Sequence, residues 1–242
     1  MPDGVWALDM AAKKVASWKP ASGKIAGTAG PAFGPDGTVY VTTTSGELAA
    51  LEARTLKPKS FVAKQSDEFT SSPLVFEFND KVLVVATTAS GLRVFDAASL
   101  STVLAQGTSA ANTRPGALAS WQDSAGTRWL LAPTGDVVTA WKVTGEAAKP
   151  SLLSGWVSRE LATATTPMVV NGVVFAVSGG GPRRSARGVL YSLDGATGKE
   201  LWSSGSAITS AAHAGGLSAG GSQMYVGTYD GTLYAFGFPI EH

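Results

Sequence analysis

The segment GVLYSLDGATGKELW, residues 188–202, contains two short β-rich runs separated by a tight turn, and it ends in a tryptophan. The side-chain oxygens of Asp194 and Thr197 can bond the backbone of such a turn, and Gly198 can adopt the left-handed conformation that closes it. We therefore predict a β-hairpin at this position. Trp202, which follows the second run, is expected to pack on a neighbouring structural unit.

The same pattern occurs six times along the chain. Its clearest second copy is GVWALDMAAKKVASW, residues 4–18, and weaker copies follow other glycines. The six leading glycines are Gly4, Gly46, Gly91, Gly135, Gly188 and Gly231. Their spacing of 42 to 53 residues is typical of the blades of a β-propeller.

A second set of turn residues supports the repeat. Pairs such as Asp36-Gly37, Asn79-Asp80 and Asn171-Gly172 each precede a run rich in Val, Tyr, Phe and Thr. Asp-Gly and Asn-Gly supply the positive φ of two-residue hairpin turns. Nowhere does an apolar period of 3.6 residues persist over the length of a helix. We predict an all-β chain, a β-propeller of about five four-stranded antiparallel blades.

Closure of the ring is ambiguous in the sequence. The pattern predicts 21 strands, whereas five blades use 20 and six use 24. The alternatives are a compact five-bladed ring with one surplus strand, or the C-terminal segment of a larger, eight-bladed propeller, which we favour. The whole chain, 1–242, is expected to form one propeller domain. Its repeat units are approximately 1–20, 21–64, 65–108, 109–158, 159–206 and 207–242.

The composition narrows the classes of partner and chemistry. The 242 residues are 44% hydrophobic and 15% charged, which indicates a globular chain. A net charge of +1 gives no electrostatic reason to expect a nucleic acid as the partner. The absence of cysteine excludes disulfides, thiolate metal sites and cysteine nucleophiles. We find no signal peptide at the N-terminus and no apolar run of the ~18 residues that a membrane span needs.

Several residues match a tryptophan-docking motif of the form A-x-D-x-x-T-G-K-x-x-W. They are Ser192, in place of alanine, Asp194, Thr197, Gly198, Lys199 and Trp202, with a looser match at Ala7, Asp9 and Trp18. On these residues the chain resembles the PQQ-binding-like (quinoprotein dehydrogenase-like) β-propeller repeat family over essentially its whole length. The resemblance implies a periplasmic or extracellular location. It also implies a structural docking role for Asp9, Trp18, Asp194, Thr197, Gly198 and Trp202.

The candidate site lies in the loops. In a propeller, the loops between successive blades and the turns between the second and third strands share one face, and we expect them to surround the mouth of the central channel. The polar residues predicted at this mouth are Glu68, Thr70, Asn112, Arg114, Arg159, Glu160, Thr166 and His213. They would form a ligand pocket in which two arginines bind carboxylates and the histidine is a base or hydrogen-bond partner. The alternative is structural: the hydroxyls cap turns, and the arginines pair locally with Glu68 and Glu160.

An insertion of about seven residues lengthens one turn on the same face. The segment GGGPRRSARG, residues 179–188, carries Arg183, Arg184 and Arg187. It is predicted either to form a basic flap that attracts anions or to be an ordinary surface insertion. The glycines alone do not indicate phosphate binding, because the Walker lysine and the Rossmann spacing are missing.

Three functions are compatible with these residues. The first is a non-catalytic scaffold that binds a ligand or a protein, similar in kind to the outer-membrane assembly lipoprotein. The second, implied by the resemblance, is the C-terminal portion of a periplasmic PQQ-dependent alcohol or sugar dehydrogenase, with PQQ and Ca²⁺ as cofactors. The third is a hydrolase that uses Glu68 and Glu160. We favour the first and predict no metal site, since the ligand set of a quinoprotein cannot be assigned.

The expected partners follow from the favoured function. They are other protein chains or a small anionic or polar ligand. An open ring would also expose unpaired strand edges, so a homodimer through open blade edges is a further expectation.

Overall fold

The computed structural model describes residues 3–11, 13–108, 116–179 and 186–237, without the side chains of residues 60–63. These residues form 21 antiparallel strands, and none of them lies in a helix. Every sheet is a meander in which strands consecutive in the sequence pair with each other. The all-β prediction is therefore confirmed.

The first two blades follow an N-terminal hairpin. The hairpin is formed by β1 (Val5–Leu8) and β2 (Lys14–Trp18). Blade 1 contains β3 (Ala32–Phe33), β4 (Val39–Thr42), β5 (Glu47–Leu51) and β6 (Pro58–Lys64). Blade 2 contains β7 (Leu74–Phe78), β8 (Lys81–Thr88), β9 (Gly91–Asp96) and β10 (Ser99–Thr108).

Two more four-stranded blades and one three-stranded blade complete the described chain. Blade 3 contains β11 (Ala119–Gln122), β12 (Arg128–Pro133), β13 (Val138–Glu146) and β14 (Lys149–Val157). Blade 4 contains β15 (Met168–Val170), β16 (Val173–Ser178), β17 (Val189–Asp194) and β18 (Glu200–Ser203). Blade 5 contains β19 (Ala212–Gly220), β20 (Gln223–Thr228) and β21 (Leu233–Gly237).

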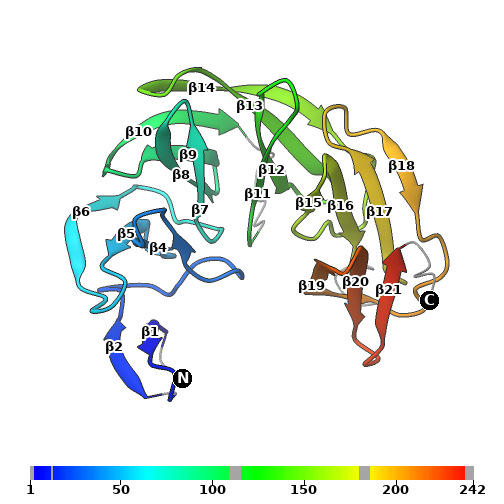
Figure 1. Cartoon of the computed structure of the whole chain (residues 1–242), viewed down its shortest axis with the longest axis horizontal. Coiled ribbons are helices and arrows are strands. Elements are labelled where there is room, and N and C mark those ends of the chain that lie inside the picture. The colour runs from blue at the N-terminus through cyan, green and yellow to red at the C-terminus, as the bar shows by residue number, and fades with distance from the viewer. Residues whose placement is uncertain (1–2, 12, 109–115, 180–185, 238–242) are drawn as a thin grey trace.

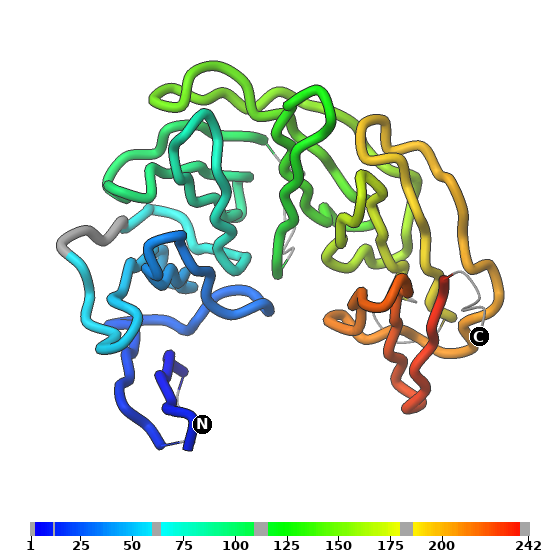
Figure 2. The backbone as a smooth tube through the Cα atoms, in the orientation of Figure 1, coloured from blue at the N-terminus to red at the C-terminus, as the bar shows by residue number. Residues whose placement is uncertain are grey.

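The sheets are arranged as an open arc (Figure 1). The N-terminal hairpin lies at one end, blade 5 lies at the other, and a gap separates them, as the backbone trace in Figure 2 also shows. The compact five-bladed ring is therefore wrong for this structure. The fold is a β-propeller arrangement of radially stacked, mostly four-stranded sheets.

The hydrophobic core is divided among the interfaces between neighbouring sheets. One cluster joins blades 1 and 2 through residues such as Leu48 and Phe95, and another joins blades 3 and 4 through Leu131 and Val174. All four of these side chains are fully buried. Alternation along each strand directs one set of side chains to the preceding blade and the other to the following blade. This explains why the central strands are apolar on both faces.

The predicted turn chemistry is present. Asn79 and Asp80 both have positive φ, at 47° and 61°, and so do Asn171 and Gly172, at 49° and 78°. These values match the type I′ geometry that joins tightly twisted strands. Side chains with short polar groups tolerate this region better than others do. The hairpins therefore follow from local sequence alone.

The docking turn of residues 194–198 has the expected bonds. Asp194 Oδ1 accepts hydrogen bonds from the backbone N–H of Thr197 at 2.8 Å and from its hydroxyl at 2.7 Å. Gly198 has φ of 71°. The tryptophan that packs on this turn is Trp156 of the preceding blade, a residue that motif matching did not single out.

The N-terminal hairpin repeats this turn. Asp9 Oδ1 accepts hydrogen bonds from the backbone N–H groups of Ala11, at 2.9 Å, and Lys13, at 2.8 Å. Trp18, in β2, packs against the cluster of blade 1 that includes Leu56. The hairpin therefore contacts blade 1 in the way that one blade contacts the next.

Candidate functional site

Two sets of connections lie together on one face of the arc, which we call the loop face. They are the loops that join successive blades and the turns that join the second strand of each blade to the third. The backbone N–H of Gln65 donates to the carbonyl oxygen of Gly46 at 2.6 Å, and that of Leu161 donates to the backbone carbonyl oxygen of Asp136 at 2.6 Å. In the last blade, the N–H of Tyr229 donates to the carbonyl of Ala211 at 3.0 Å. The inter-blade loops are thus tied to the turns in several blades.

Three successive inter-blade loops also contact one another. The carbonyl oxygen of Gly116 accepts hydrogen bonds from the N–H of Thr28, at 3.1 Å, and of Ser72, at 2.8 Å. Gly27 lies so close to this junction that a Cβ atom would be 1.9 Å from the nitrogen of Ser72. The loops that precede blades 1, 2 and 3 therefore form one packed unit on the loop face.

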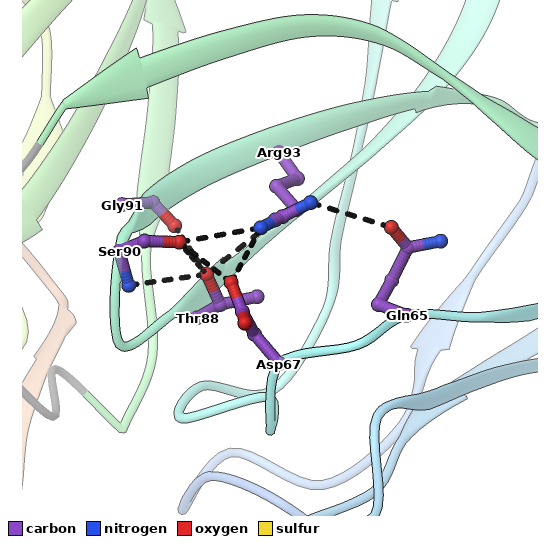
Figure 3. A network of polar contacts seen from close by, with 6 residues as sticks. All are labelled: Gln65, Asp67, Thr88, Ser90, Gly91 and Arg93. Atoms are coloured by element: carbon purple, nitrogen blue, oxygen red, sulfur yellow. Dashed lines mark hydrogen bonds and ion pairs between the residues drawn. The ribbon is translucent and has the colours of Figure 1, made fainter.

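A polar network on this face is centred on Arg93 (Figure 3). Its Nη2 lies 2.5 Å from Asp67 Oδ2 and 3.2 Å from Ser90 Oγ, and its Nη1 lies 3.4 Å from Gln65 Oε1. The hydroxyl of Ser90 donates to Asp67 Oδ2 at 2.8 Å. The guanidinium thus joins the loop before blade 2 to the turn between β8 and β9.

The environment of Asp67 favours its ionised form. The hydrogen bond from Ser90, followed by the positive charge of Arg93, lowers the pKa of Asp67 below its usual value. The side chain of Arg93 is 15% exposed and that of Asp67 is 35% exposed, so the ion pair is only partly shielded from solvent. We conclude that the network fixes the shape of the loop of residues 65–73.

Sequence reasoning missed Asp67, Ser90 and Arg93. The sequence contains an indication of this network, because Arg93 is the one charged residue before Asp96 in an otherwise apolar strand. A charge in such a strand requires a partner on a neighbouring segment. The partner could not be read from the sequence, because Asp67 belongs to the loop that arrives from blade 1.

The predicted mouth residues of this same loop have different surroundings. Thr70 is buried, and its hydroxyl lies 3.0 Å from that of Thr87 in β8. Glu68 is exposed, beside the Asp67–Arg93 pair. Of the two, only Glu68 is available to a ligand or partner.

Arg159 does not point to the other predicted mouth residues. Its Nη1 lies 2.6 Å from Glu200 Oε2, in the outer strand β18, and its guanidinium lies 5.0 Å from the ring centroid of Tyr191. The expected local pairing of Arg159 with the adjacent Glu160 is therefore wrong. Arg159 connects the end of blade 3 to the outer part of blade 4.

The remaining predicted residues are separated or lie outside the described residues. Glu160 and His213 are exposed and Thr166 is half-buried. The His213 ring lies 3.8 Å from that of Tyr229 in blade 5. The basic flap residue Arg187 is exposed. The predicted residues outside the described ranges are Asn112, Arg114, Arg183 and Arg184.

Among the described residues, no ligand set can be assigned to the PQQ–Ca²⁺ site that the resemblance implied. The carboxylate of Asp67 is already bound by Arg93 and Ser90. Within residues 3–237, apart from the gaps given above, no three His, Cys, Asp or Glu side chains are grouped as metal ligands. We therefore derive no redox step for this chain.

The described part of the chain also contains no helix long and apolar enough to cross a membrane.

No protein-family model and no curated protein matches the sequence. Several solved structures match the fold. BamB from Moraxella catarrhalis is 17% identical with a TM-score of 0.55, and the match covers 98% of this chain and 80% of BamB. The dihydro-heme d1 dehydrogenase NirN, solved in complex with DHE, is 12% identical with a TM-score of 0.65. That match covers 96% of this chain and 47% of NirN, so the chain spans about half of that enzyme.

A third match is BBS1N, solved in complex with ARL6DN. It is 13% identical with a TM-score of 0.58, and the match covers 93% of this chain and 67% of BBS1N. At such identities the similarity concerns the fold alone. The chain therefore shares the β-propeller architecture of proteins with different functions.

Proposed function

We propose that this chain is a non-catalytic propeller scaffold that binds another protein through its loop face. The observation that carries the proposal is the Arg93–Asp67–Ser90 network, which holds the loop of residues 65–73 in one shape. A loop fixed before binding loses little conformational entropy when a partner docks. The exposed Glu68 lies on this loop and provides a charged contact.

Two further observations support a protein partner. The inter-blade loops are bonded to one another at Gly116, so the loop face forms a continuous surface over blades 1 to 3. The structural neighbour BBS1N was solved with a protein, ARL6DN. Propellers commonly present loops on one face for such contacts. By the resemblance of its repeats, we place the chain in the periplasm or outside the cell.

The proposal is tested by site-specific photo-crosslinking. A photoreactive amino acid at Glu68 is expected to capture a discrete protein partner in cells. The same group at Asp80, in a turn at the opposite end of the strands of blade 2, serves as the matched control. Arg93→Ala should reduce capture at Glu68 by releasing the loop. Equal capture at both positions, or none at Glu68, would contradict the proposal.

A small anionic or polar ligand is the alternative occupant of the loop face. NirN, solved with DHE, is a neighbour that holds a small molecule, and Arg187 supplies an exposed cation in this chain. A PQQ titration followed by absorbance, with and without Ca²⁺ and an electron acceptor, tests the dehydrogenase alternative. Stoichiometric binding with reduction of the acceptor would overturn the scaffold proposal.

The hydrolase alternative requires two acids that act together. Glu68 precedes blade 2 and Glu160 precedes blade 4, and no contact joins them among the described residues. Loss of a hydrolytic activity in both Glu68→Gln and Glu160→Gln would support this function. We expect no such activity.

A further inference from the structure

A pocket lies between blades 1 and 2, at the ends of the strands opposite the loop face. It has a volume of about 390 Å³, which is within the range of pockets that bind small molecules. Blade 1 contributes the turn between β3 and β4 and the side chains of Tyr40 and Lys59. Blade 2 contributes Val82 of β8 and the turn between β9 and β10.

One wall of the pocket carries a pair of opposite charges. Lys59 Nζ lies 3.2 Å from Asp36 Oδ2 and also donates to the hydroxyl of Thr38. The hydroxyl of Thr38 donates to Asp36 Oδ2 at 2.6 Å, and its backbone N–H donates to Oδ1 at 3.0 Å. These bonds from Thr38 are the largest cause that lowers the pKa of Asp36 to about 2. The carboxylate is therefore ionised at neutral pH, and the wall has no net charge.

Both charged groups retain hydrogen-bonding capacity towards a bound molecule. Within the described residues, Lys59 uses two of the three N–H groups of its ammonium. Asp36 accepts three hydrogen bonds there, and a carboxylate has about four lone-pair positions. The side chains of Lys59 and Asp36 are 32% and 63% exposed, so a solute can reach them. One donor and one acceptor are thus available side by side.

The rest of the pocket is mostly apolar. Tyr40 is buried, and its hydroxyl donates to the backbone carbonyl of Ala97 at 3.2 Å. Burial raises the pKa of Tyr40, so the phenol stays neutral. Val82 and the methyl groups of Ala97 and Ala98 line the side that blade 2 provides. An apolar part of a bound molecule would displace water from these surfaces favourably.

The corresponding turn of blade 4 contacts an aromatic ring. Ala97 directly follows the third strand of blade 2, as Gly195 follows the third strand of blade 4. The carbonyl of Gly195 accepts a 2.9 Å hydrogen bond from the indole of Trp156, in the preceding blade. The carbonyl of Ala97 accepts instead from Tyr40. A planar ring that carries an N–H group is therefore compatible with this position of the repeat.

We propose that the pocket between blades 1 and 2 binds a small planar molecule that carries a carboxamide group. The amide N–H donates to Asp36, and the amide oxygen accepts the remaining N–H of Lys59. The ring lies against Tyr40 and the apolar side of the pocket. A carboxamide supplies a donor and an acceptor without a net charge, which matches the neutral pair on the wall.

Molecules with the same ring and a net charge match the pocket less well. A carboxylate could pair with Lys59 but would be repelled by Asp36, and an ammonium would be attracted by Asp36 but repelled by Lys59. The pocket is at the opposite end of the strands from Glu68 and Arg93. Its failure to bind would therefore leave the proposed function of the loop face intact.

The test uses benzamide as the probe, with benzoate and benzylamine as charged probes of the same ring. Titration of the isotope-labelled full chain, followed by NMR, should show saturable shifts of the backbone signals of Val82, Ala97 and Ala98. Benzoate and benzylamine should each bind at least fivefold more weakly than benzamide.

A first pair of variants tests the polar wall. Lys59→Met removes the free N–H but keeps an unbranched side chain, and it should weaken benzamide binding at least fivefold. Lys57→Met changes an exposed lysine outside the pocket. It is the matched control and should alter the affinity less than twofold.

A second pair tests the volume of the pocket without changing its charges. Ala98 is exposed at the rim, and Ala98→Phe should fill the pocket and weaken benzamide binding at least fivefold. Ala196 is the equivalent exposed alanine of blade 4, and both residues donate a backbone N–H to the aspartate two positions earlier. Ala196→Phe is therefore the matched control and should leave the affinity unchanged within twofold.

Four outcomes would overturn the proposal. They are the absence of saturable benzamide binding, shifts confined to residues outside the pocket, binding of benzoate or benzylamine as tight as that of benzamide, and unchanged affinity in both Lys59→Met and Ala98→Phe. If Lys59→Met is poorly folded, Ala98→Phe decides alone, because its substitution is at an exposed turn.

Discussion

The indole of Trp156 donates a 2.9 Å hydrogen bond to the carbonyl oxygen of Gly195, which joins blade 3 to blade 4. The same ring packs against Gly198, where a side chain would have no room. The tryptophan of one repeat thus recognises the turn of the next. A hydrogen bond between two residues separated by 39 positions thus links neighbouring blades.

Substitution of Gly198 should destabilise this junction. A Cβ at position 198 would lie 2.4 Å from the Trp156 ring, and the residue has φ of 71°. Gly135 also has φ of 71° but no atom within 4 Å of its Cβ position. We expect Gly198→Ala to lower the free energy of unfolding by about 1–3 kcal/mol more than Gly135→Ala does, since only the first adds overpacking. Chemical denaturation of both variants measures the difference, and equal losses would show that the contact with Trp156 is unimportant.

Truncation of a side chain between blades should lower the free energy of unfolding more than truncation of a side chain at the surface. Leu131 is fully buried between blades 3 and 4, whereas Leu153 is 53% exposed. Leu131→Ala should destabilise the chain by about 2–5 kcal/mol, because it leaves a cavity in a packed core. Leu153→Ala should cost less than about 1 kcal/mol. Urea denaturation tests this pair, and similar losses would argue against the inter-blade position of Leu131.

Removal of Arg93 should release the loop before blade 2. Arg93→Ala takes away the guanidinium that binds Asp67, Ser90 and Gln65. Hydrogen exchange of residues 65–73 should become faster, and the pKa of Asp67 should rise towards its usual value because a nearby positive charge is lost. Arg159→Ala removes an exposed arginine paired with Glu200 and should leave this loop unchanged. Unaltered exchange in Arg93→Ala would remove the basis of the proposed scaffold face.

Acid should reduce the contribution of the ionised Asp36 side chain to the stability of the folded chain. Hydrogen bonds from the side chain and backbone of Thr38 lower the pKa of Asp36 to about 2, and Lys59 contributes further. A lowered pKa in the folded state stabilises the protein above the unfolded pKa, and this stabilisation is lost as the pH falls through the folded value. The stability difference between the wild type and Asp36→Asn should therefore shrink between about pH 4 and pH 2. Its size will be modest, because the side chain is well exposed. Denaturation at several pH values checks the trend, and a constant difference would contradict it.

Much of the local structure was determined by the sequence. Alternating apolar residues predict strands, and Asn79, Asp80 and Asn171 favour the positive φ that tight hairpins require. The turn at Asp194 forms through bonds to residues two and three positions away. These interactions involve near neighbours in the chain, so their patterns are visible without a structure.

The side-chain pairings of the loops and the open form of the arc are visible only in the tertiary structure. Arg159 pairs with Glu200, 41 positions away, and Arg93 pairs with Asp67 across the junction between two blades. Whether the arc closes depends on the angle between neighbouring blades, and small differences in that angle accumulate from one blade to the next. The physical reason is that inter-blade packing sets both the pairings and the angle, and a repeat pattern along the sequence does not encode the relative orientation of its copies.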